Sequence, residues 1–437
     1  MEYKEKELKK GIKLHTINTD KFKTNLIAVF LTTKLDRKTV TSNALISAIL
    51  RRGSKTMPTQ EEISMQMEEM YGASFDCGLD KTGDNQVLKF YVETLNDNFL
   101  PQGGQNLLKT SVEKLLDIVF NPVIENEKFK QEYVEQEKNN LKQRIEGKID
   151  NKARYALDRC IEEMYKDKPF GLYKFGYVED LENIDEINLY EAYKKLIETC
   201  KIDIFISGKI DQNIEEEILK NENIMNLEQR IPDYVASNND IKEKKQENVV
   251  TESMDVTQGK LVLGLDVNID DEELKYDVLV YNSILGGSAN SKMFQNVREK
   301  AHLAYVASSS YLRYKNNIFI NCGIEIANYE KAVELIKKQI DDMKKGDFTE
   351  EEIENAKKGI IATIKTIEDE QDTEITYYLG QELTNHAISV KEYMDKIQKV
   401  TKQNVVDVAN KISINTIYFL RDWTQKVITP STSKKLH

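Results

Sequence analysis

The chain has 437 residues, a length that suits two domains of roughly 200 residues each. Hydrophobic residues make up 40% of the sequence and charged residues 31%, which is typical of a folded globular protein and excludes a disordered chain. The net charge of −12 would repel a nucleic-acid backbone or an anionic membrane surface, so we expect neither as a partner.

The N-terminal segment and the cysteines both favour a cytoplasmic location. Residues 1–15 are charged and lack the apolar stretch of a secretory signal, and apolar runs such as residues 26–31 are far too short to span a bilayer. The cysteines show no Cys-x-x-Cys spacing, so we expect free thiols in a reducing compartment. They are Cys77, Cys160, Cys200 and Cys322.

The first half of the chain alternates predicted strands and helices. Residues 25–31 form a continuous apolar run of strand length, which predicts a strand covered on both faces. Residues 43–50 are apolar on nearly all sides and predict a buried helix. One helix is predicted from residue 125 to about residue 164. The other expected elements are strands at 11–15 and 202–208, a hairpin with strands at 72–78 and 86–92, and helices at 60–71, 107–119 and 186–199.

Residues 228–253 are polar and aperiodic, which predicts a linker between an N-terminal domain, 1–227, and a C-terminal domain, 254–437. The alternative is a long surface loop inside one domain, which is uncommon at that length. After this segment the same order of elements returns. Strands are expected at 260–267, 305–311, 318–324 and 416–420, and helices at 276–285, 329–345, 349–367, 390–400 and 403–412.

The two halves correspond segment by segment. Residues 129–135 match residues 348–354 in pattern, and the closing strand at 202–207 matches residues 417–422. The sequence therefore predicts an α+β protein built from a duplicated unit, so that the two domains are homologous.

Residues 282–310, NSILGGSANSKMFQNVREKAHLAYVASSS, predict a helix end, a turn, a short helix and a strand. We expect Gly286 and Gly287 to make the turn with positive φ, which residues with a Cβ resist. Arg298 and Tyr305 lie on either side of the bend from helix to strand. A guanidinium and a phenol can together hold a carbonyl or a carboxylate. The alternative is a surface arginine and a half-buried strand tyrosine.

The string F-x-x-V-R-E-K-x-x-L-A-Y, preceded by L-G-G, resembles the C-terminal half of the pitrilysin/insulinase family, the inverzincin peptidases related to mitochondrial processing peptidase. The resemblance covers most of the chain, because that family also has two homologous halves joined by a linker. It implies two domains, each a mostly antiparallel sheet covered by helices, arranged as a clam-like chamber. It also implies that Arg298 and Tyr305 form a substrate-binding pair.

Active members of that family carry H-x-x-E-H on the first buried helix, where two histidines bind zinc and the glutamate activates water. Registering this pattern on residues 52–54, at the end of the predicted helix, places Ala44 and Ala48 at the ligand positions and Ser47 at the base. The distal glutamate ligand falls on Arg144, which puts a cation where a metal would lie. We therefore expect a degenerate zinc site, with no metal ligand and no catalytic residue in this chain alone.

The histidines do not suggest a second zinc site, because none has a partner four residues later. His302 lies beside the Arg298/Tyr305 pair and is either a general base or, more commonly for such a residue, a surface or packing histidine. The four histidines are His15, His302, His386 and His437.

Bacterial members of the family occur as pairs in which a zinc-less chain supplies the Arg/Tyr pair in trans, and this sequence is similar to that chain. The first hypothesis is therefore a non-catalytic subunit of a heterodimeric zinc metallopeptidase that cuts peptides, with zinc on a partner carrying H-x-x-E-H. The second is a structural scaffold subunit. The third is a homodimer that binds peptides without hydrolysing them. In this family peptides add a strand to a sheet edge, and residues 74–79 correspond to that edge.

Overall fold

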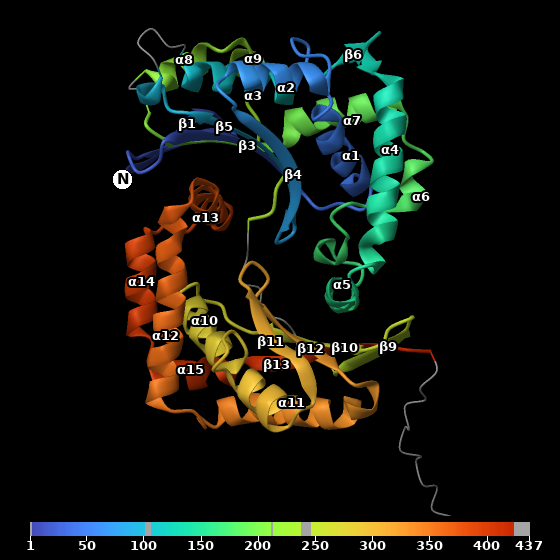
Figure 1. Cartoon of the computed structure of the whole chain (residues 1–437), viewed down its shortest axis with the longest axis vertical. Coiled ribbons are helices and arrows are strands. Elements are labelled where there is room, and N and C mark those ends of the chain that lie inside the picture. The colour runs from blue at the N-terminus through green and yellow to red at the C-terminus, as the bar shows by residue number, and fades with distance from the viewer. Residues whose placement is uncertain (1, 101–105, 211–212, 237–245, 424–437) are drawn as a thin grey trace, which may run out of the picture. The chain divides into compact units, whose positions relative to one another are not determined.

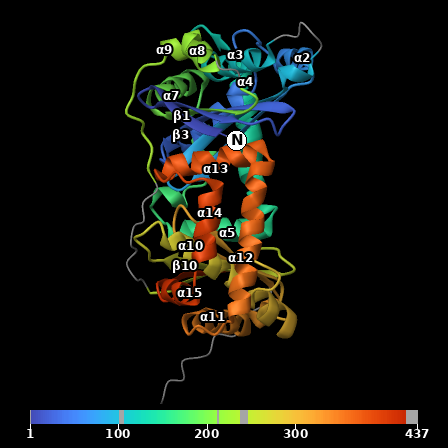
Figure 2. The same ribbon diagram turned by 90° about the vertical axis from the view of Figure 1, so that its left-hand side faces the viewer.

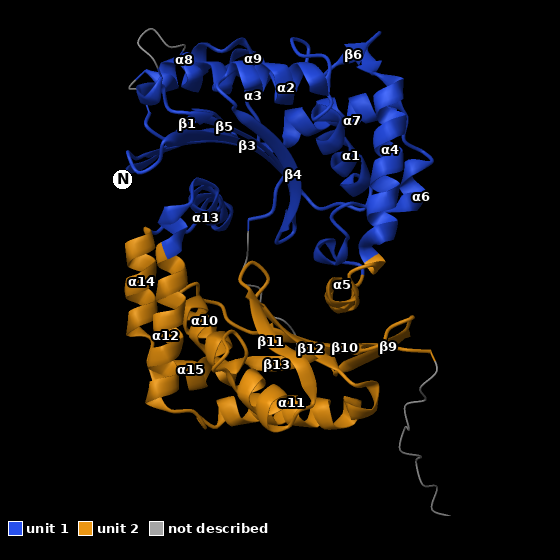
Figure 3. Cartoon of the chain, viewed as in Figure 1, with its two compact units in different colours: residues 1–148, 167–237, 366–388 blue, residues 149–166, 238–365, 389–437 orange. Residues whose placement is uncertain are grey.

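The computed structural model describes residues 2–100, 106–210, 213–236 and 246–423 (Figure 1). The chain divides into two compact units, coloured separately in Figure 3. These units differ from the predicted division at residues 227 and 254, because each half of the chain contributes one segment to the other unit. Unit 1 comprises residues 1–148, 167–237 and 366–388, and unit 2 comprises residues 149–166, 238–365 and 389–437.

Six of the described strands form the sheet of unit 1, in the order β1-β2-β8-β3-β5-β4. Neighbouring strands are antiparallel except for the parallel pair β2 and β8. The predicted strands and hairpin of this half are confirmed, whereas the charged strand β1 was not predicted. The bounds are β1 (Glu2–Lys9), β2 (Ile12–Asn18), β3 (Thr24–Lys34), β4 (Ser74–Thr82), β5 (Asn85–Leu95) and β8 (Lys201–Gly208).

The central strand β3 is buried on both faces, as its continuous apolar sequence predicts. Ile27 and Val29 belong to a core shared with the main helical layer, whereas Ala28 and Phe30 belong to a second core on the opposite face. The helices of unit 1 that precede residue 227 are α1 (Val40–Leu50), α2 (Gln60–Glu69), α3 (Leu107–Phe120), α4 (Gln131–Glu146), α6 (Val178–Leu181), α7 (Glu186–Thr199), α8 (Ile214–Lys220) and α9 (Glu222–Asn226).

The prediction of a single helix from residue 125 to about residue 164 is wrong. Asn126 and Glu127 both have positive φ and form the turn of a small hairpin, β6 (Ile124–Glu125) and β7 (Lys128–Phe129). α4 then ends at Gly147, and a second helix, α5 (Lys152–Met164), begins after Asn151, whose side chain caps it.

The sheet of unit 2 has the strand order β11-β12-β10-β13-β9, with β13 and β9 parallel. Figure 1 shows α11 and α15 on one side of this sheet and α5 on the other. Among the described helices none is long and apolar enough to cross a bilayer. The elements of this unit, besides α5, are β9 (Asn248–Ser253), β10 (Gly259–Val267), α10 (Leu274–Leu285), β11 (Ala304–Leu312), β12 (Asn317–Ile324), α11 (Tyr329–Lys344), α12 (Glu350–Lys365), α14 (Val390–Lys399), α15 (Lys402–Ala409) and β13 (Ile412–Arg421).

Part of the predicted linker, 228–253, belongs to the two units themselves. Residues 248–253 form the edge strand β9, and the Arg230 backbone N–H donates to the Lys10 carbonyl at 3.0 Å within unit 1. An edge strand needs few apolar residues, so its sequence resembled that of a linker. The part of the predicted linker at 237–245 lies outside the described residues.

The helix α13 (Gln371–Thr384) was not predicted, yet it forms the second core of unit 1. It lies against the sheet of that unit in both Figure 1 and Figure 2. Its buried side chains Ile375, Leu379 and Leu383 pack against residues of β3 that include Ala28 and Phe30. A helix from the second half of the sequence therefore covers the sheet face that the first half leaves open.

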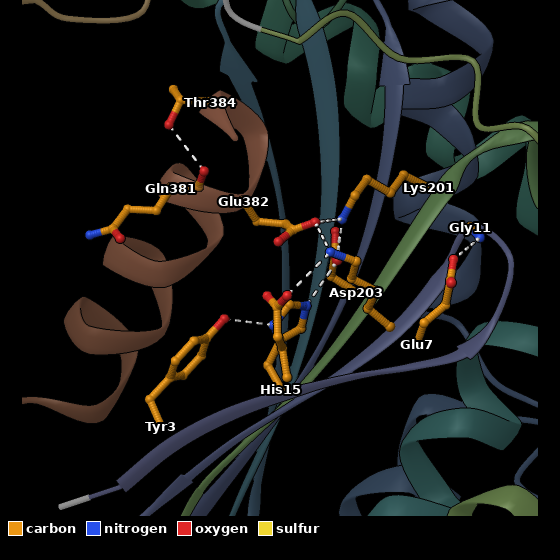
Figure 4. Close-up of polar contacts among 11 residues, drawn as sticks. Tyr3, Glu7, Gly11, His15, Lys201, Asp203, Gln381, Glu382 and Thr384 are labelled. Carbon is orange, nitrogen blue, oxygen red and sulfur yellow. Dashed lines mark hydrogen bonds and ion pairs between the residues drawn. The ribbon is translucent and has the colours of Figure 1, made fainter. Parts of the chain in front are cut away.

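Buried charges also join α13 to the sheet (Figure 4). Asp203 on β8 accepts from His15 Nε2 at 3.0 Å and from the Lys201 ammonium, and Lys201 lies 3.2 Å from the Glu382 carboxylate on α13. Lys13 donates to the same carboxylate at 2.7 Å. Burial alone would raise the pKa of Asp203, but Lys201 and His15 outweigh it and lower the pKa to about 2.

Candidate functional site

A cavity of about 390 Å³ lies in unit 1 between α1, α4 and β4. Its wall includes Ala44, Ser47 and Ala48 from α1 and Arg144 from α4. The four residues that the sequence register assigns to the degenerate zinc site therefore surround one cavity. They come from two helices, α1 and α4, that lie about a hundred residues apart in the chain.

Local packing turns Ser47 towards the sheet. The Ser47 hydroxyl donates to the Gly78 carbonyl at 3.3 Å, and the Cys77 thiol donates to the Ser47 carbonyl at 3.8 Å. These contacts fasten α1 to β4, and they engage the only hydroxyl among the four positions with a backbone acceptor.

The cavity is strongly cationic. Arg51, Arg52 and Arg144 line it, against a single carboxylate, Glu137. Arg52 is paired with Glu137 at 3.3 Å, whereas the Arg144 guanidinium lies 5.0 Å from the centre of the Phe175 ring. Within the described residues neither Arg51 nor Arg144 has a carboxylate within ion-pair distance.

The residues around this cavity do not fit a zinc ion. Ala44 and Ala48 offer no ligand atom, and Arg144 brings a positive charge. Burial raises the pKa of the Cys77 thiol to about 11, against the opposing effect of Arg51, so the thiolate that zinc prefers is disfavoured. Over the ranges that the structure describes, no group of three histidine, cysteine, aspartate or glutamate side chains is arranged to hold a metal.

None of the histidines that the structure describes lines this cavity. His15 is fully buried in the Asp203 cluster, and its ring also lies 2.9 Å from the Tyr3 hydroxyl. His302 has a φ of 52° and is exposed at the turn before β11. His386 is not among the residues that line the cavity, and His437 lies outside the described residues.

In unit 2, Arg298 lies on a π-helix, η4 (Met293–Lys300). Such helices are rare and are frequently found at functional sites. Its side chain is 43% exposed, stacks at 4.5 Å over the Phe294 ring, and makes only a long contact of 3.5 Å to the neighbouring Glu299. The guanidinium fork is thus oriented by an aromatic ring and still open to an acceptor.

Tyr305 is the extra residue of a β-bulge in β11. Its neighbours Ala304 and Val306 pair with consecutive residues of β12, so Tyr305 has no partner in the ladder. Its side chain is 63% exposed. Bulges commonly re-aim a side chain next to a functional site. No hydrogen bond joins Arg298 and Tyr305 in the described part of the chain, so the two side chains are separate donors on irregular backbone.

The glycine pair before this segment acts differently from the prediction. Gly286 has a φ of −159° and Gly287 is also absent from the residues with positive φ. A Cβ on Gly286 would lie 2.6 Å from the Ser309 backbone nitrogen, which donates to the Gly286 carbonyl at 2.8 Å. The glycine is therefore needed for the close approach of α10 to β11.

Sequence reasoning identified Arg144 but missed Arg51, Arg52 and Glu137, which also set the charge of the cavity. Glu137 lies seven residues before Arg144, or two helical turns, so the spacing on α4 could have indicated that both residues share a face. Arg51 and Arg52 directly follow α1, but they belong to no motif that would have assigned them to the site.

Residues 74–79, predicted as the peptide-binding edge, lie in β4, which ends the strand order of unit 1. The same strand contributes Cys77, Gly78 and Leu79 to the cavity wall. The cavity and an unpaired strand edge therefore adjoin each other.

Comparison with known proteins identifies similar chains. Residues 183–360 match the family model described as Peptidase M16 inactive domain. The chain is 34% identical over 421 residues to "Probable inactive metalloprotease YmfF" of Bacillus subtilis, an alignment that covers 94% of this chain and 96% of that protein. It is 22% identical to "Uncharacterized zinc protease YmxG" of the same species, over 74% of this chain and 75% of that one.

Solved structures give the same picture of the fold. A conserved protein from Enterococcus faecalis is 27% identical with a TM-score of 0.88, over 98% of this chain and 100% of that chain. A peptidase M16 inactive domain from Pseudomonas fluorescens is 16% identical with a TM-score of 0.76, over 98% and 100% of the two chains.

Proposed function

Because the chain belongs to the M16 peptidase family, the pitrilysin/insulinase family, and is a non-catalytic homologue within it, we propose that it is the zinc-less subunit of a heterodimeric zinc metallopeptidase. The partner would be a homologous cytoplasmic chain with an intact H-x-x-E-H site, and the substrate a peptide. Zinc chemistry would belong to that partner, since the residues around the cavity of this chain do not fit the metal.

The observation that carries this proposal is the contrast between the two sets of residues. The positions that would hold the metal carry alanine, serine and arginine, whereas Arg298 and Tyr305 are presented on a π-helix and a β-bulge with their polar ends exposed. π-helices are frequently found at functional sites, and β-bulges are over-represented next to active sites. A purely structural role would not require either side chain to be exposed.

In the proposed mechanism this chain binds and polarises the substrate. The Arg298 guanidinium and the Tyr305 hydroxyl would donate hydrogen bonds to the carbonyl oxygen under attack, and these bonds strengthen as that oxygen gains negative charge. Separately, within unit 1, the edge of β4 would bind a peptide backbone by adding it as a further strand. The partner would supply the zinc-activated water.

The first test is purification of this chain from its native cells under mild conditions, followed by assay of the eluate on a mixed peptide pool with and without a chelator. We expect a chain with H-x-x-E-H to co-purify and cleavage to stop when the chelator is added. Recovery of the chain alone without cleavage would favour a scaffold, and peptide binding by the chain alone as a dimer would favour a non-hydrolysing carrier.

The sharper test is Arg298→Ala in the reconstituted complex. Loss of one such donor typically lowers kcat by about 10²–10³, so we expect a decrease on that scale without loss of assembly. Lys300→Ala is the matched control, since Lys300 is an exposed cation on the same helix that bonds to Asn296. Unchanged turnover of the Arg298→Ala complex, with assembly intact, would refute the proposed role.

A further inference from the structure

A second cavity, of about 600 Å³, lies on the opposite side of the same edge strand and shares Cys77 and Gly78 with the first. Successive side chains of β4 face the two cavities in turn. Cys77 and Leu79 point into the core beneath the helices, whereas Asp76 pairs with Tyr91 on the face that carries α13. The edge of β4 is therefore flanked by one cavity on each face of the sheet.

The two cavities have opposite charge. The first is lined by three arginines and one carboxylate, whereas the second contains five carboxylates and one lysine. Lys89 is bound to Asp80, and Asp369 to Lys21, so these charges are partly neutralised. The charged groups of the second cavity are Asp76, Lys89, Glu93, Asp369, Glu370 and Asp372.

Four of these carboxylates lack a cationic partner. Over the described ranges no ion pair is formed by Asp76, Glu93, Glu370 or Asp372. Burial first, and then Asp372, Asp80 and Asp76, raise the pKa of the Tyr91 phenol. The uncompensated charges are thus Arg51 and Arg144 on one side of β4 and these four carboxylates on the other.

Successive side chains of an extended peptide point to opposite faces of the sheet that it joins. A strand added at β4 would therefore send alternate side chains into the two cavities. Charge complementarity then decides which side chains fit. The arginine cavity favours a carboxylate and the carboxylate cavity favours an ammonium or guanidinium.

We propose that this edge selects extended peptides in which acidic and basic residues alternate, with the acidic side chains in the cavity beside α1 and the basic ones in the cavity beside α13. The proposal rests on the peptide binding at β4 described under Proposed function and adds the class of peptide. It also gives a role to the residues that replaced the metal site, because Arg144 becomes a ligand for an anion.

The test compares two labelled peptides of about eight residues, a typical strand length, with the same composition of glutamate and lysine. One alternates the two residues and the other has them in two blocks, so both have the same net charge. Binding to the full-length protein is followed by fluorescence anisotropy at low salt, where exposed charges are least screened. We expect the alternating peptide to bind about tenfold more tightly.

Charge-reversal variants locate the effect. Arg144→Glu and Asp372→Lys should each weaken the alternating peptide by about tenfold and leave the block peptide nearly unchanged. Lys142→Glu is the matched control, since Lys142 is exposed on the same helix as Arg144 and lines neither cavity. All three side chains substituted here are exposed, so the variants should fold.

The outcomes separate this inference from the proposed function. Equal binding of the alternating and block peptides would overturn charge selection while leaving peptide binding at β4 in place. Failure of both peptides to bind the protein would also overturn the inference, whereas the subunit role would still be decided by Arg298→Ala in the complex. If Lys142→Glu lost as much affinity as Arg144→Glu, the net charge of the protein would explain the effect, and selection by the cavity would be overturned.

Discussion

Two helices, α5 and α13, occupy corresponding places in the duplicated halves, each following a long helix, α4 or α12, yet they are held by different chemistry. α13 packs an apolar face on the sheet of unit 1 and adds Glu382 to a buried cluster of charges. α5 also buries apolar side chains, among them Ala156 and Ile161, but on the sheet of unit 2 it adds a close approach and one carboxylate in place of a charge cluster.

Under α5, Met164 lies so close to β10 that a Cβ on Gly264 would be 2.1 Å from its sulfur. Glu252 on β9 accepts from the Tyr155 hydroxyl at 2.6 Å and from Arg159 Nε at 3.1 Å, both on α5. Tyr418 donates to the same carboxylate. In both units a helix that follows a long helix packs across the sheet, but different interactions hold α5 and α13 in place.

Removal of α13 should have the largest effect on the stability of unit 1. A chain that ends at residue 227, the boundary predicted from sequence, lacks the apolar face formed by Ile375, Tyr378, Leu379 and Leu383. Full burial of such a side chain contributes about 1.5–3 kcal/mol, so their combined loss approaches the whole stability of a domain. We expect this fragment to be insoluble or to unfold without cooperativity, measured by soluble yield and thermal unfolding.

The control for that experiment is residues 1–236 joined by a flexible linker to residues 366–388, which restores every segment of unit 1 that the structure describes. Recovery of cooperative unfolding in this fusion would assign the defect to α13. A soluble, cooperatively folded fragment without α13 would contradict the assignment of this helix to the core of unit 1.

The second prediction compares the central carboxylates of the two crossings. Asp203→Asn leaves Lys201 and His15 buried with less compensation, so we expect a loss of about 3 kcal/mol in the free energy of unfolding. Glu252→Gln, in a partly exposed network, should cost about 1 kcal/mol.

Asp20→Asn, which removes an exposed ion pair with Lys209, serves as the control and should change the free energy of unfolding by less than about 1 kcal/mol. Urea denaturation at pH 7 measures all three. Because the pKa of Asp203 is lowered to about 2, its contribution is complete above about pH 4 and is lost as the pH falls through 2. Equal costs for Asp203→Asn and Glu252→Gln would remove the distinction between the crossings.

These two helices also mark the limits of the sequence analysis. Periodicity was sufficient for β3 and α1, where continuous apolar runs reflect burial on all sides. α13 follows an acidic run and contains Gly380, so its apolar face was not recognised. The strand β1 was missed because it is an edge strand built mainly from glutamate and lysine.

The candidate site was predictable where a motif fixed the register. Ala44, Ser47, Ala48 and Arg144 line one cavity, as an alignment on the end of the first buried helix implies. The charge of that cavity was not predictable in the same way. Arg51 belongs to no motif, and only the packing of α4 beside α1 shows that it and Arg144 share a cavity.

The last prediction concerns the pH dependence of stability and a buried carboxylate on α13, Glu374. Glu374 is fully buried, and neither of its carboxylate oxygens has a hydrogen-bond partner in the described chain. Burial, followed by the nearby Glu368, raises its pKa to about 7, against the opposing effect of Lys21. The folded state therefore binds a proton more tightly than the unfolded state, whose pKa is about 4.3.

A raised pKa stabilises the folded state fully below the unfolded pKa, and this contribution is lost as the pH rises through 7. We expect the free energy of unfolding to fall by about 3 kcal/mol relative to Glu374→Gln between pH 4 and pH 8. Asp277→Asn is the control in unit 2, because burial and then Asp407 raise the pKa of Asp277 to about 6. The pH dependence of the free energy of unfolding could instead persist in Glu374→Gln and disappear in Asp277→Asn. That result would assign the proton to α10 instead of α13, and the packing of α13 on its sheet would then be independent of pH in this range.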